Sequence, residues 1–295
     1  MKTSFNRPQN TETANDTQKE GFSVRKKLIV GTMAACAVFG TSACSNEAPR
    51  PEGAPSYEEL TPFQQQHFFE LNEDGELVSS EEAYHQTMEN LYEAEPTVEG
   101  FQQFEAGLQG IYDDIQANGW DHPYLYLSDE TYEETPPRVT LHFTAWPEEA
   151  WDKSGLDFAE SQYNACMNGA CGSASAYIDR EGGGYKLIPD EKVANHAKSY
   201  SKKSRGIETP AFLAQDVSPE QYEGMIYMAA HWYLKDRPDG TKPLTEDEAK
   251  EYIIGHGEIT ELKHEGDHTD FMLPVADAIA LKFRALTNEV IAGRE

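Results

Sequence analysis

The segment 138–146 reads Arg-Val-Thr-Leu-His-Phe-Thr-Ala-Trp and is the clearest strand signal in this chain. Apolar and polar residues alternate along it, as they do along a strand with two different faces. A β-hairpin is predicted downstream, where the segments 173–180 and 185–188 flank three consecutive glycines. These strands come after a long stretch of helical sequence, and this order predicts the class of fold.

Helices are predicted wherever apolar residues recur at helical spacing between capping residues, prolines and turn signals. The predicted helices cover about 57–71, 80–93, 97–115, 147–165, 218–237, 245–254 and 274–290. Because helices come first and a few strands follow, we expect an α+β fold, in which several helices pack with a small, mainly antiparallel sheet.

Residues 25–44 combine three basic residues, an apolar run over 28–39 and small residues before a cysteine. The apolar run is too short to cross a bilayer comfortably, and the pattern is typical of an export signal peptide. It resembles the bacterial lipoprotein signal with its lipobox, and the matching residues are Ser42, Ala43 and Cys44. In that family the cysteine becomes the first mature residue and carries lipid.

The resemblance implies that Cys44 is acylated, palmitate being a typical chain, and anchors the protein to the cell membrane on its extracytoplasmic face. Thr41 departs from the family, which usually has an aliphatic residue there, and Cys36 ends a second, shorter candidate signal. Ordinary cleavage after Ala43, or an uncleaved anchor, are alternatives. The predicted organisation is a signal peptide over 1–43, a lipidated cysteine with a proline-rich flexible tether over 44–56, and a single extracytoplasmic domain over 57–295.

The chain is strongly acidic, with 52 Asp and Glu residues, 24 Lys and Arg residues and a formal net charge of −28. Such a surface favours solubility and repels nucleic acid, so we exclude nucleic-acid binding. Basic residues gather between Lys192 and Arg205. That segment could dock an anionic envelope polymer or an acidic face of an envelope protein, although a charge run is also an ordinary solvated surface.

Two of the four cysteines, Cys166 and Cys171, remain if Cys36 is removed with the signal and Cys44 is lipidated. An Asn-Gly pair between them is a turn signal that brings the flanking residues together. In an oxidising compartment this spacing predicts a disulfide between Cys166 and Cys171. Free structural thiols are the alternative, and the spacing differs from the Cys-x-x-Cys of redox-active pairs.

The pentapeptide 264–268, His-Glu-Gly-Asp-His, fits the H-E-x-x-H string of zinc metallopeptidases. In that family two histidines one helical turn apart bind Zn²⁺, and the glutamate polarises the zinc-bound water. Gluzincin-type members add a downstream glutamate, and Glu289 lies in a similar place on the predicted last helix. The resemblance implies a zinc-dependent hydrolase that uses His264, Glu265, His268 and Glu289.

Gly266 and Asp267 depart from that string, whose middle residues are normally uncharged and suited to a helix. Residues 258–264 alternate like a strand that could pair with 269–273, and a β-hairpin would leave Glu265 in solvent. A metal site survives in that geometry, because imidazoles and a carboxylate are zinc ligands. Its candidate ligands are His256, His264, His268 and Asp270. The alternative is that these residues are solvated turn residues.

The leading hypothesis from the sequence is a lipid-anchored protein of the bacterial envelope that binds or organises an envelope component, without enzymatic activity and without a cofactor. Its expected partners are membrane lipid, through acylated Cys44, and an envelope protein or polymer. The alternatives are a hydrolase or metal-binding protein that holds zinc in the 264–268 segment, and a small-ligand-binding module. An apolar cavity near Trp146, Trp232 and Tyr233 would favour the module.

Overall fold

One mixed sheet with helices on both of its faces organises the described residues. The computed structural model describes residues 55–123, 125–126, 130–134, 136–237, 242–263, 271 and 273–294. The chain divides into two units, Met1–Asn46 and Glu47–Glu295, and every described residue lies in the second. Cys44 and the predicted signal peptide therefore lie outside the described residues, as does most of the predicted tether.

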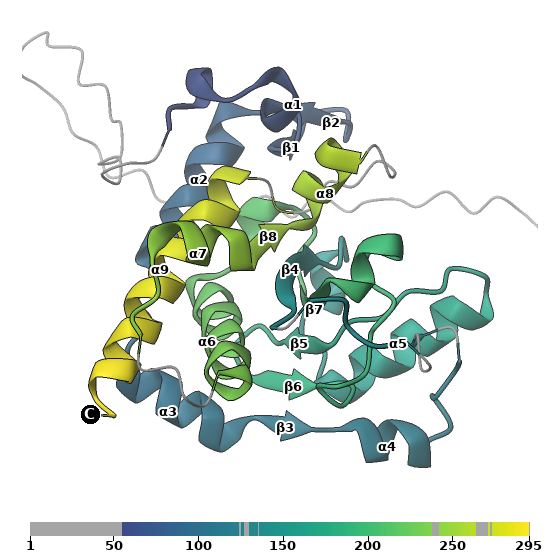
Figure 1. Cartoon of the computed structure of the whole chain (residues 1–295). Helices are drawn as coiled ribbons and strands as arrows, with labels where there is room; N and C mark the ends of the chain where they lie inside the picture. The colour runs from purple at the N-terminus through teal and green to yellow at the C-terminus, as the bar shows by residue number, and fades with distance from the viewer. Residues whose placement is uncertain are drawn as a thin grey trace, which may run out of the picture. The chain divides into compact units, whose positions relative to one another are not determined.

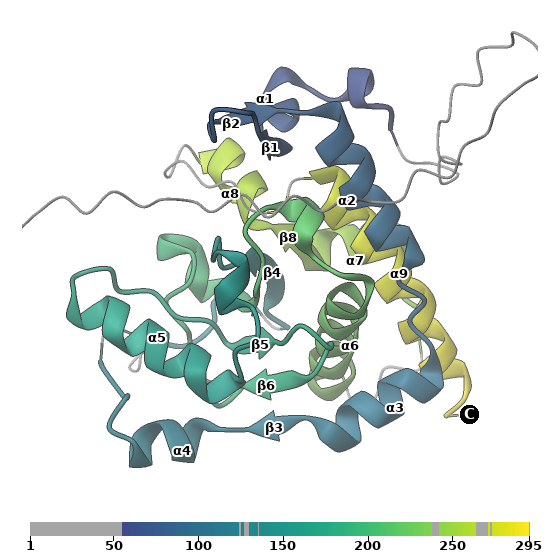
Figure 2. The ribbon, with the colours of Figure 1, turned by 180° about the vertical axis from the view of Figure 1, so that it is seen from behind.

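The strands form a six-stranded sheet and a separate hairpin. They are β1 (Phe69–Leu71), β2 (Leu77–Ser79), β3 (Gln109–Gly110), β4 (Arg138–Phe143), β5 (Ala176–Ile178), β6 (Gly184–Lys186), β7 (Ser204–Thr209) and β8 (Ile253–Gly255). The main sheet has the order β3-β6-β5-β7-β4-β8 (Figures 1 and 2). β5 and β6 form the predicted antiparallel hairpin, whereas β5–β7, β7–β4, β4–β8 and β3–β6 are parallel pairs. The α+β class is confirmed, and the main sheet is mixed.

The helices follow the predicted order with shifted bounds. They are α1 (Pro62–Gln65), α2 (Glu81–Glu93), α3 (Val98–Gly107), α4 (Tyr112–Ala117), α5 (Gly155–Met167), α6 (Pro219–Asp236), α7 (Glu246–Tyr252), α8 (His256–Lys263) and α9 (Leu273–Ala292), with 3-10 turns at Tyr57–Glu59, Glu148–Ala150, Lys198–Lys202 and Ala214–Asp216. Side-chain caps explain several starts: Ser80, Thr97 and Ser218 each accept a hydrogen bond from a backbone N–H of the first turn.

Three predicted helices are interrupted. The helix predicted over 147–165 starts as a 3-10 turn at Glu148–Ala150, and α5 begins only at Gly155. The segment 57–71 ends in β1, which pairs with β2 across a turn where Gly75 has a φ of +79°. The helix predicted over 97–115 divides into α3 and α4, because Gln109 and Gly110 pair with β6 instead. Glycines 107 and 110 weaken the helix at that point.

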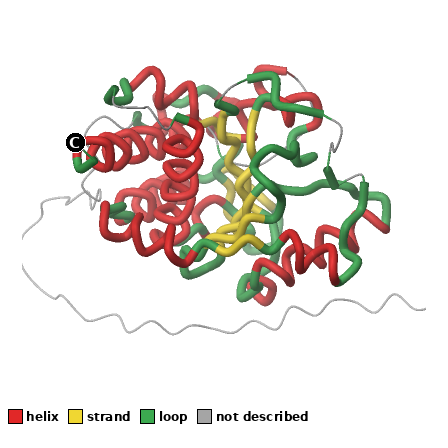
Figure 3. Tube along the Cα trace, turned by 60° about the horizontal axis from the view of Figure 1, so that its bottom comes forward, coloured by secondary structure: helices red, strands yellow, loops and turns green. Residues whose placement is uncertain are grey.

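The sheet separates two layers of helices (Figure 3). On one face, the strand residues Val139, Leu141, Phe143 and Ile207 enter a large core with α2, α3, α6, α7 and α9. On the other face, Tyr177 packs with α4 and α5. Nearer β8, that second face is covered by the 3-10 turn at Lys198–Lys202 and by α8, through Tyr200, Ile254 and Ile259.

Helices near the two ends of the described chain pack together. α2 and α9 lie side by side (Figures 1 and 2) and share the large core through Leu91 and Ile279. Nζ of Lys282 on α9 donates to the carbonyl oxygen of Ala94, at the end of α2, over 2.7 Å. Among the described residues, every helix falls short of the length and apolarity that crossing a bilayer requires.

The β-hairpin predicted over 258–273 is wrong at the positions that are described. Residues 256–263 form α8, and Leu273 begins α9. Oε2 of Glu258 accepts a hydrogen bond from N–H of Gly255 over 2.6 Å, which satisfies a backbone donor at the start of α8. This local bond favours a helix over the strand that the alternating sequence indicated. Residues 264–270, including the 264–268 pentapeptide, lie outside the described residues.

Candidate active site

His142 lies on the polar face of β4, and only 3% of its surface is exposed. The alternating sequence sends Val139 and Leu141 into the apolar core on one side of the sheet and Thr140 and His142 to the other side. Thr140 there donates a hydrogen bond to Oγ of Ser204 over 2.7 Å. β4 is thus a buried strand with one face reserved for polar groups.

His196 lies over this polar face, in the segment that follows β6. Its Nδ1 is 3.0 Å from Nε2 of His142, and its own Nε2 is 2.9 Å from the carbonyl oxygen of Ser204. Its ring rests on Gly206 of β7, where a Cβ atom would lie 2.6 Å from Cγ of His196. A glycine at 206 is therefore what allows the imidazole to approach the sheet so closely.

The two hydrogen bonds determine which ring nitrogens carry protons. A carbonyl oxygen only accepts, so Nε2–H of His196 donates to Ser204. Burial and the neighbouring imidazoles of His142 and His256 lower the pKa of His196 well below 6.5, so its ring is neutral and Nδ1 accepts. Nε2–H of His142 then donates to His196. This chain leaves the lone pair of His142 on Nδ1, the nitrogen that can bind a metal.

His256 brings a second imidazole to the same place. It directly follows β8, the parallel neighbour of β4, and its ring centroid is 4.4 Å from that of His142. The chain returns to this point at Phe271, whose carbonyl oxygen accepts from N–H of Gly257 over 3.1 Å. A Cβ atom at Gly255 would lie 2.1 Å from that oxygen, so a glycine is needed before His256.

Glu208 adds a carboxylate beside the histidines. It lies next to His142 in the parallel β4–β7 register and next to Tyr177 in the β5–β7 register, so the three side chains leave the same face of the sheet. One carboxylate oxygen, Oε2, is buried. Burial, together with the nearby carboxylates of Asp179 and Glu208, raises the pKa of the Tyr177 hydroxyl. The carboxylate is therefore close to the sheet surface that carries the histidines.

His142, Glu208 and His256 lie at the carboxyl ends of neighbouring parallel strands. His142 and Glu208 are the penultimate residues of β4 and β7, and His256 follows the last residue of β8. Open sheets bind ligands at this edge, because loops diverge there. Two imidazoles with a carboxylate beside them are ligands and a base suited to zinc chemistry, and the proton placement on His142 fits metal binding.

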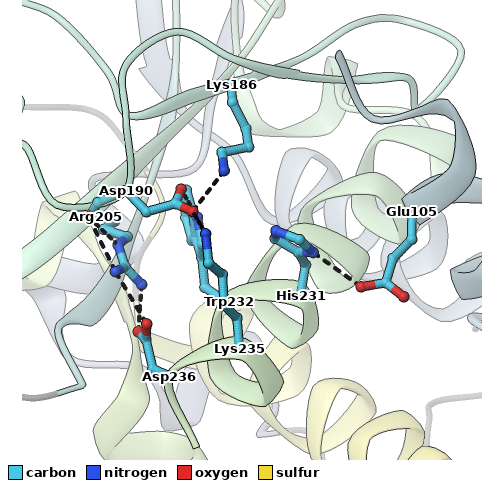
Figure 4. A network of polar contacts seen from close by, with 8 residues as sticks. All are labelled: Glu105, Lys186, Asp190, Arg205, His231, Trp232, Lys235 and Asp236. Carbon is cyan, nitrogen blue, oxygen red and sulfur yellow. Dashed lines mark hydrogen bonds and ion pairs between the residues drawn. The ribbon is translucent and has the colours of Figure 1, made fainter. Parts of the chain in front are cut away.

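A partly buried ionic network holds the segment that carries His196 (Figure 4). Asp190 accepts hydrogen bonds from Lys186, Lys235 and Trp232. Burial alone would raise the pKa of Asp190, but hydrogen bonds from Lys186 and Lys235 lower it to about 2. Arg205 is 4% exposed and lies 2.6 Å from Asp236. Arg205 is therefore part of the interior and contributes nothing to the basic surface predicted between Lys192 and Arg205.

Of the residues predicted to bind or activate a metal, only His256 and Glu289 are among the described residues. His256 lies against His142, a partner that sequence reasoning did not consider. His264, Glu265, His268 and Asp270 lie outside the described residues. Glu289 is an exposed residue of α9.

The predicted disulfide between Cys166 and Cys171 is confirmed, at the end of α5. His122 lies beside it, and the ligand atoms of these three residues lie within 4.8 Å of one another. An imidazole and the two cysteine sulfur atoms therefore meet here, apart from the histidines at the sheet edge, although the sulfur atoms are bonded to each other.

Trp232 and Tyr233 lie in a packed core, at the place where a ligand-binding module would have needed an apolar cavity. Trp232 is 1% exposed within the large core, and Tyr233 packs there against Tyr252 and Phe283. A polar cavity of about 210 Å³ borders Tyr233 and is also lined by Arg138, at the amino end of β4. That is the end of β4 opposite to His142, so the cavity does not belong to the histidine site.

Comparison with known proteins finds one matching family. Residues 132–270 match the N-acetylmuramoyl-L-alanine amidase family, and this range contains His142, His196, Glu208 and His256. No curated protein matches the chain in sequence.

Three solved structures show distant likeness. The Ph2119 endolysin from Thermus scotoductus MAT2119 bacteriophage Ph2119 is 14% identical, with a TM-score of 0.38 over 59% of this chain and 97% of its own. The endolysin N-acetylmuramoyl-L-alanine amidase LysCS from Clostridium intestinale URNW is 16% identical, with a TM-score of 0.31 over 44% of this chain and 75% of its own. A point mutant of Drosophila PGRP-LB is 18% identical, with a TM-score of 0.33 over 55% of this chain and 99% of its own. These likenesses are too distant to carry function.

The unspecified binding or organising role, which was the leading hypothesis from the sequence, is wrong. The match of residues 132–270 to an amidase family overturns it. The sequence reasoning missed His142, His196 and Glu208. A signal for His142 was present, because this histidine occupies the polar side of the most clearly alternating strand in the chain.

Proposed function

We propose that this protein is a zinc-dependent amidase that cleaves the amide bond between N-acetylmuramic acid and L-alanine in peptidoglycan. The observation that carries the proposal is the meeting of His142 and His256 at one edge of the sheet, beside Glu208. The family match over residues 132–270 supports the substrate class. Peptidoglycan is an anionic envelope polymer, so an envelope polymer remains the proposed partner.

His142 and His256 are the proposed zinc ligands, since both imidazoles are buried and lie in contact. Asp270 is proposed as a third ligand, because the chain contacts the residue after His256 at Phe271. When bound, zinc supplies a Lewis acid and a water molecule that ionises near neutral pH. His264 and His268 stay predictions for further ligands.

The chain's own residues then have separate roles. His196 keeps the proton of His142 on Nε2 and so fixes the orientation of that ring. The carboxylate of Glu208 is the proposed general base. It would take a proton from the water that attacks the amide carbonyl carbon, and give that proton to the nitrogen of L-alanine as the C–N bond breaks. The half-buried position of Glu208 keeps this carboxylate close to the sheet edge.

Digestion of purified peptidoglycan tests the activity. Mass spectrometry of the products should show stem peptides with a free L-alanine amino group and glycan strands without peptides. His142→Ala and His256→Ala should abolish release, whereas His85→Ala, at an exposed histidine of α2, should leave it unchanged. Binding of peptidoglycan without cleavage by the zinc-loaded protein would reject the amidase and leave a binding protein.

A lipid anchor at Cys44 remains our proposal for the location of the protein. The support is the resemblance of the segment 25–44 to a lipoprotein signal. Cys44→Ala should move the protein from the detergent phase to the aqueous phase in detergent partitioning of whole cells, or leave an unprocessed precursor. Unchanged recovery in the detergent phase, at the processed size, would reject acylation at Cys44.

A further inference from the structure

Three potential metal ligands converge at the end of α5, apart from the histidines of the sheet edge. Nδ1 of His122 is 3.5 Å from Sγ of Cys166, and the ligand atoms of His122, Cys166 and Cys171 lie within 4.8 Å of one another. Cys166 is 5% exposed, whereas Cys171 is exposed to solvent. The group therefore has a buried side and an open side, as a metal site that exchanges its ion with solvent needs.

Local backbone structure brings the two sulfur atoms together. α5 ends in a tight turn in which Gly169 has a φ of +93°, and N–H of Ala170 donates to the carbonyl oxygen of Ala165 over 3.0 Å. This turn reverses the chain, so that Cys171 returns to Cys166. The turn depends on its own backbone bonds, and we expect it to persist when the disulfide is open.

His122 is held by contacts that do not involve the cysteines. Its carbonyl oxygen accepts from N–H of Leu125 over 2.9 Å, and the carbonyl oxygen of Leu125 accepts from N–H of Asn195 over 3.1 Å. Leu125 is 3% exposed and packs with Ile188 and Ala194. The backbone of His122 is therefore tied to its surroundings without the disulfide, and we expect the imidazole to stay near the sulfur atoms after reduction.

The redox state decides whether these atoms can act as ligands. The sulfur atoms of a disulfide bind metals weakly, whereas two thiolates and an imidazole form a typical zinc donor set. A trialkylphosphine reduces the disulfide with one water molecule, giving two thiols and the phosphine oxide. Binding of Zn²⁺ then displaces the two thiol protons, and a water molecule can complete the tetrahedron.

We propose that His122, Cys166 and Cys171 form a second cation site, which opens when the disulfide is reduced and takes one zinc ion or another thiophilic ion. This site shares no residue with the histidine site of the sheet edge. Its presence is independent of whether the protein cleaves peptidoglycan.

The test counts bound zinc in the full-length chain, purified in detergent without a histidine tag. Samples with and without phosphine treatment are dialysed anaerobically against limiting zinc and analysed for zinc per chain. Reduction should add about one zinc ion to each chain. His122→Ala and Cys171→Ser should lose this gain, whereas His85→Ala should keep it.

Circular dichroism before and after reduction shows whether each variant remains folded. Because zinc is compared within each variant, zinc in the histidine site cancels out of the difference. The proposal fails if reduction adds no zinc to the wild-type chain. It also fails if folded His122→Ala gains as much zinc as the wild type, since His122 would then not be a ligand of the ion.

Discussion

Nε2 of His142 lies 3.0 Å from Nδ1 of His196, so a partly buried histidine orients a buried one. The bond from His196 to the carbonyl oxygen of Ser204 sets the tautomer of both rings. His196 is thus a positioning residue, which acts on the site through His142.

Replacing His196 should weaken zinc binding without removing a ligand. We expect His196→Ala to bind zinc about 10- to 100-fold more weakly, as loss of a group that orients a ligand usually does. Competition with a chromophoric chelator measures the affinity. His231→Ala, at a histidine paired with Glu105 on another face of the fold, is the control. Equal zinc affinity in His196→Ala and wild type would contradict a positioning role.

A methyl group at Gly206 should displace the ring of His196. The Cβ of Gly206→Ala would lie 2.6 Å from Cγ of His196, and such crowding costs about 1–3 kcal/mol. We expect a lower urea midpoint and weaker zinc binding. Gly107→Ala is the matched control, because its Cβ would meet no atom within 4 Å. If the two variants unfold at the same urea concentration, the ring of His196 does not pack against Gly206 as described.

Glu208→Gln separates catalysis from metal binding. The amide keeps the size of the side chain but is a poor base, so the rate of peptidoglycan cleavage should fall by about 100- to 10,000-fold. Zinc content should stay at the wild-type level. Glu160→Gln, at an exposed position of α5, should change neither quantity. A zinc-loaded Glu208→Gln variant with full activity would exclude Glu208 as the base.

The Asp190 network predicts how stability depends on pH. Because the folded-state pKa of about 2 lies below the ordinary value of 3.8, ionised Asp190 stabilises the fold above pH 4, and this contribution disappears as the pH falls towards 2. Asp190→Asn should therefore lower the free energy of unfolding by about 2 kcal/mol at pH 7.

Urea unfolding at pH 7 and at pH 2.5 tests this expectation, with Asp113→Asn on the exposed side of α4 as control. The difference between Asp190→Asn and wild type should shrink at the lower pH. A difference that stays constant would mean that packing, and not charge, explains the effect of the substitution.

Local signals in the sequence were sufficient for much of the fold. The strand predicted over 138–146, the glycine hairpin and the helix that begins after Ser218 each depend on neighbours in the chain. All three are confirmed, although the strand ends at Phe143. The direction of most strand pairs was not accessible in this way. Parallel pairing of β4 with β7 and β8 joins segments that are distant in sequence, and no local pattern specifies it.

The same distinction explains the outcome at the site. His256 drew attention because it lies near other metal-ligating residues in sequence, although its described partner, His142, lies on a strand predicted far upstream. Glu208 looked like an ordinary acidic residue, because only the β4–β7 register places it beside His142. A site made by neighbouring parallel strands is visible only once their order is known.

The contact between α2 and α9 has a consequence for dissecting this protein. The family match begins at residue 132 and ends at residue 270, so both helices lie outside it. Yet they bury one another and contribute Leu91 and Phe283 to the core that backs β4. A fragment trimmed to the matched range would expose that apolar surface to water. Both flanking helices, α2 and α9, are therefore required to cover the sheet. The sheet should lose its resistance to protease when either helix is deleted.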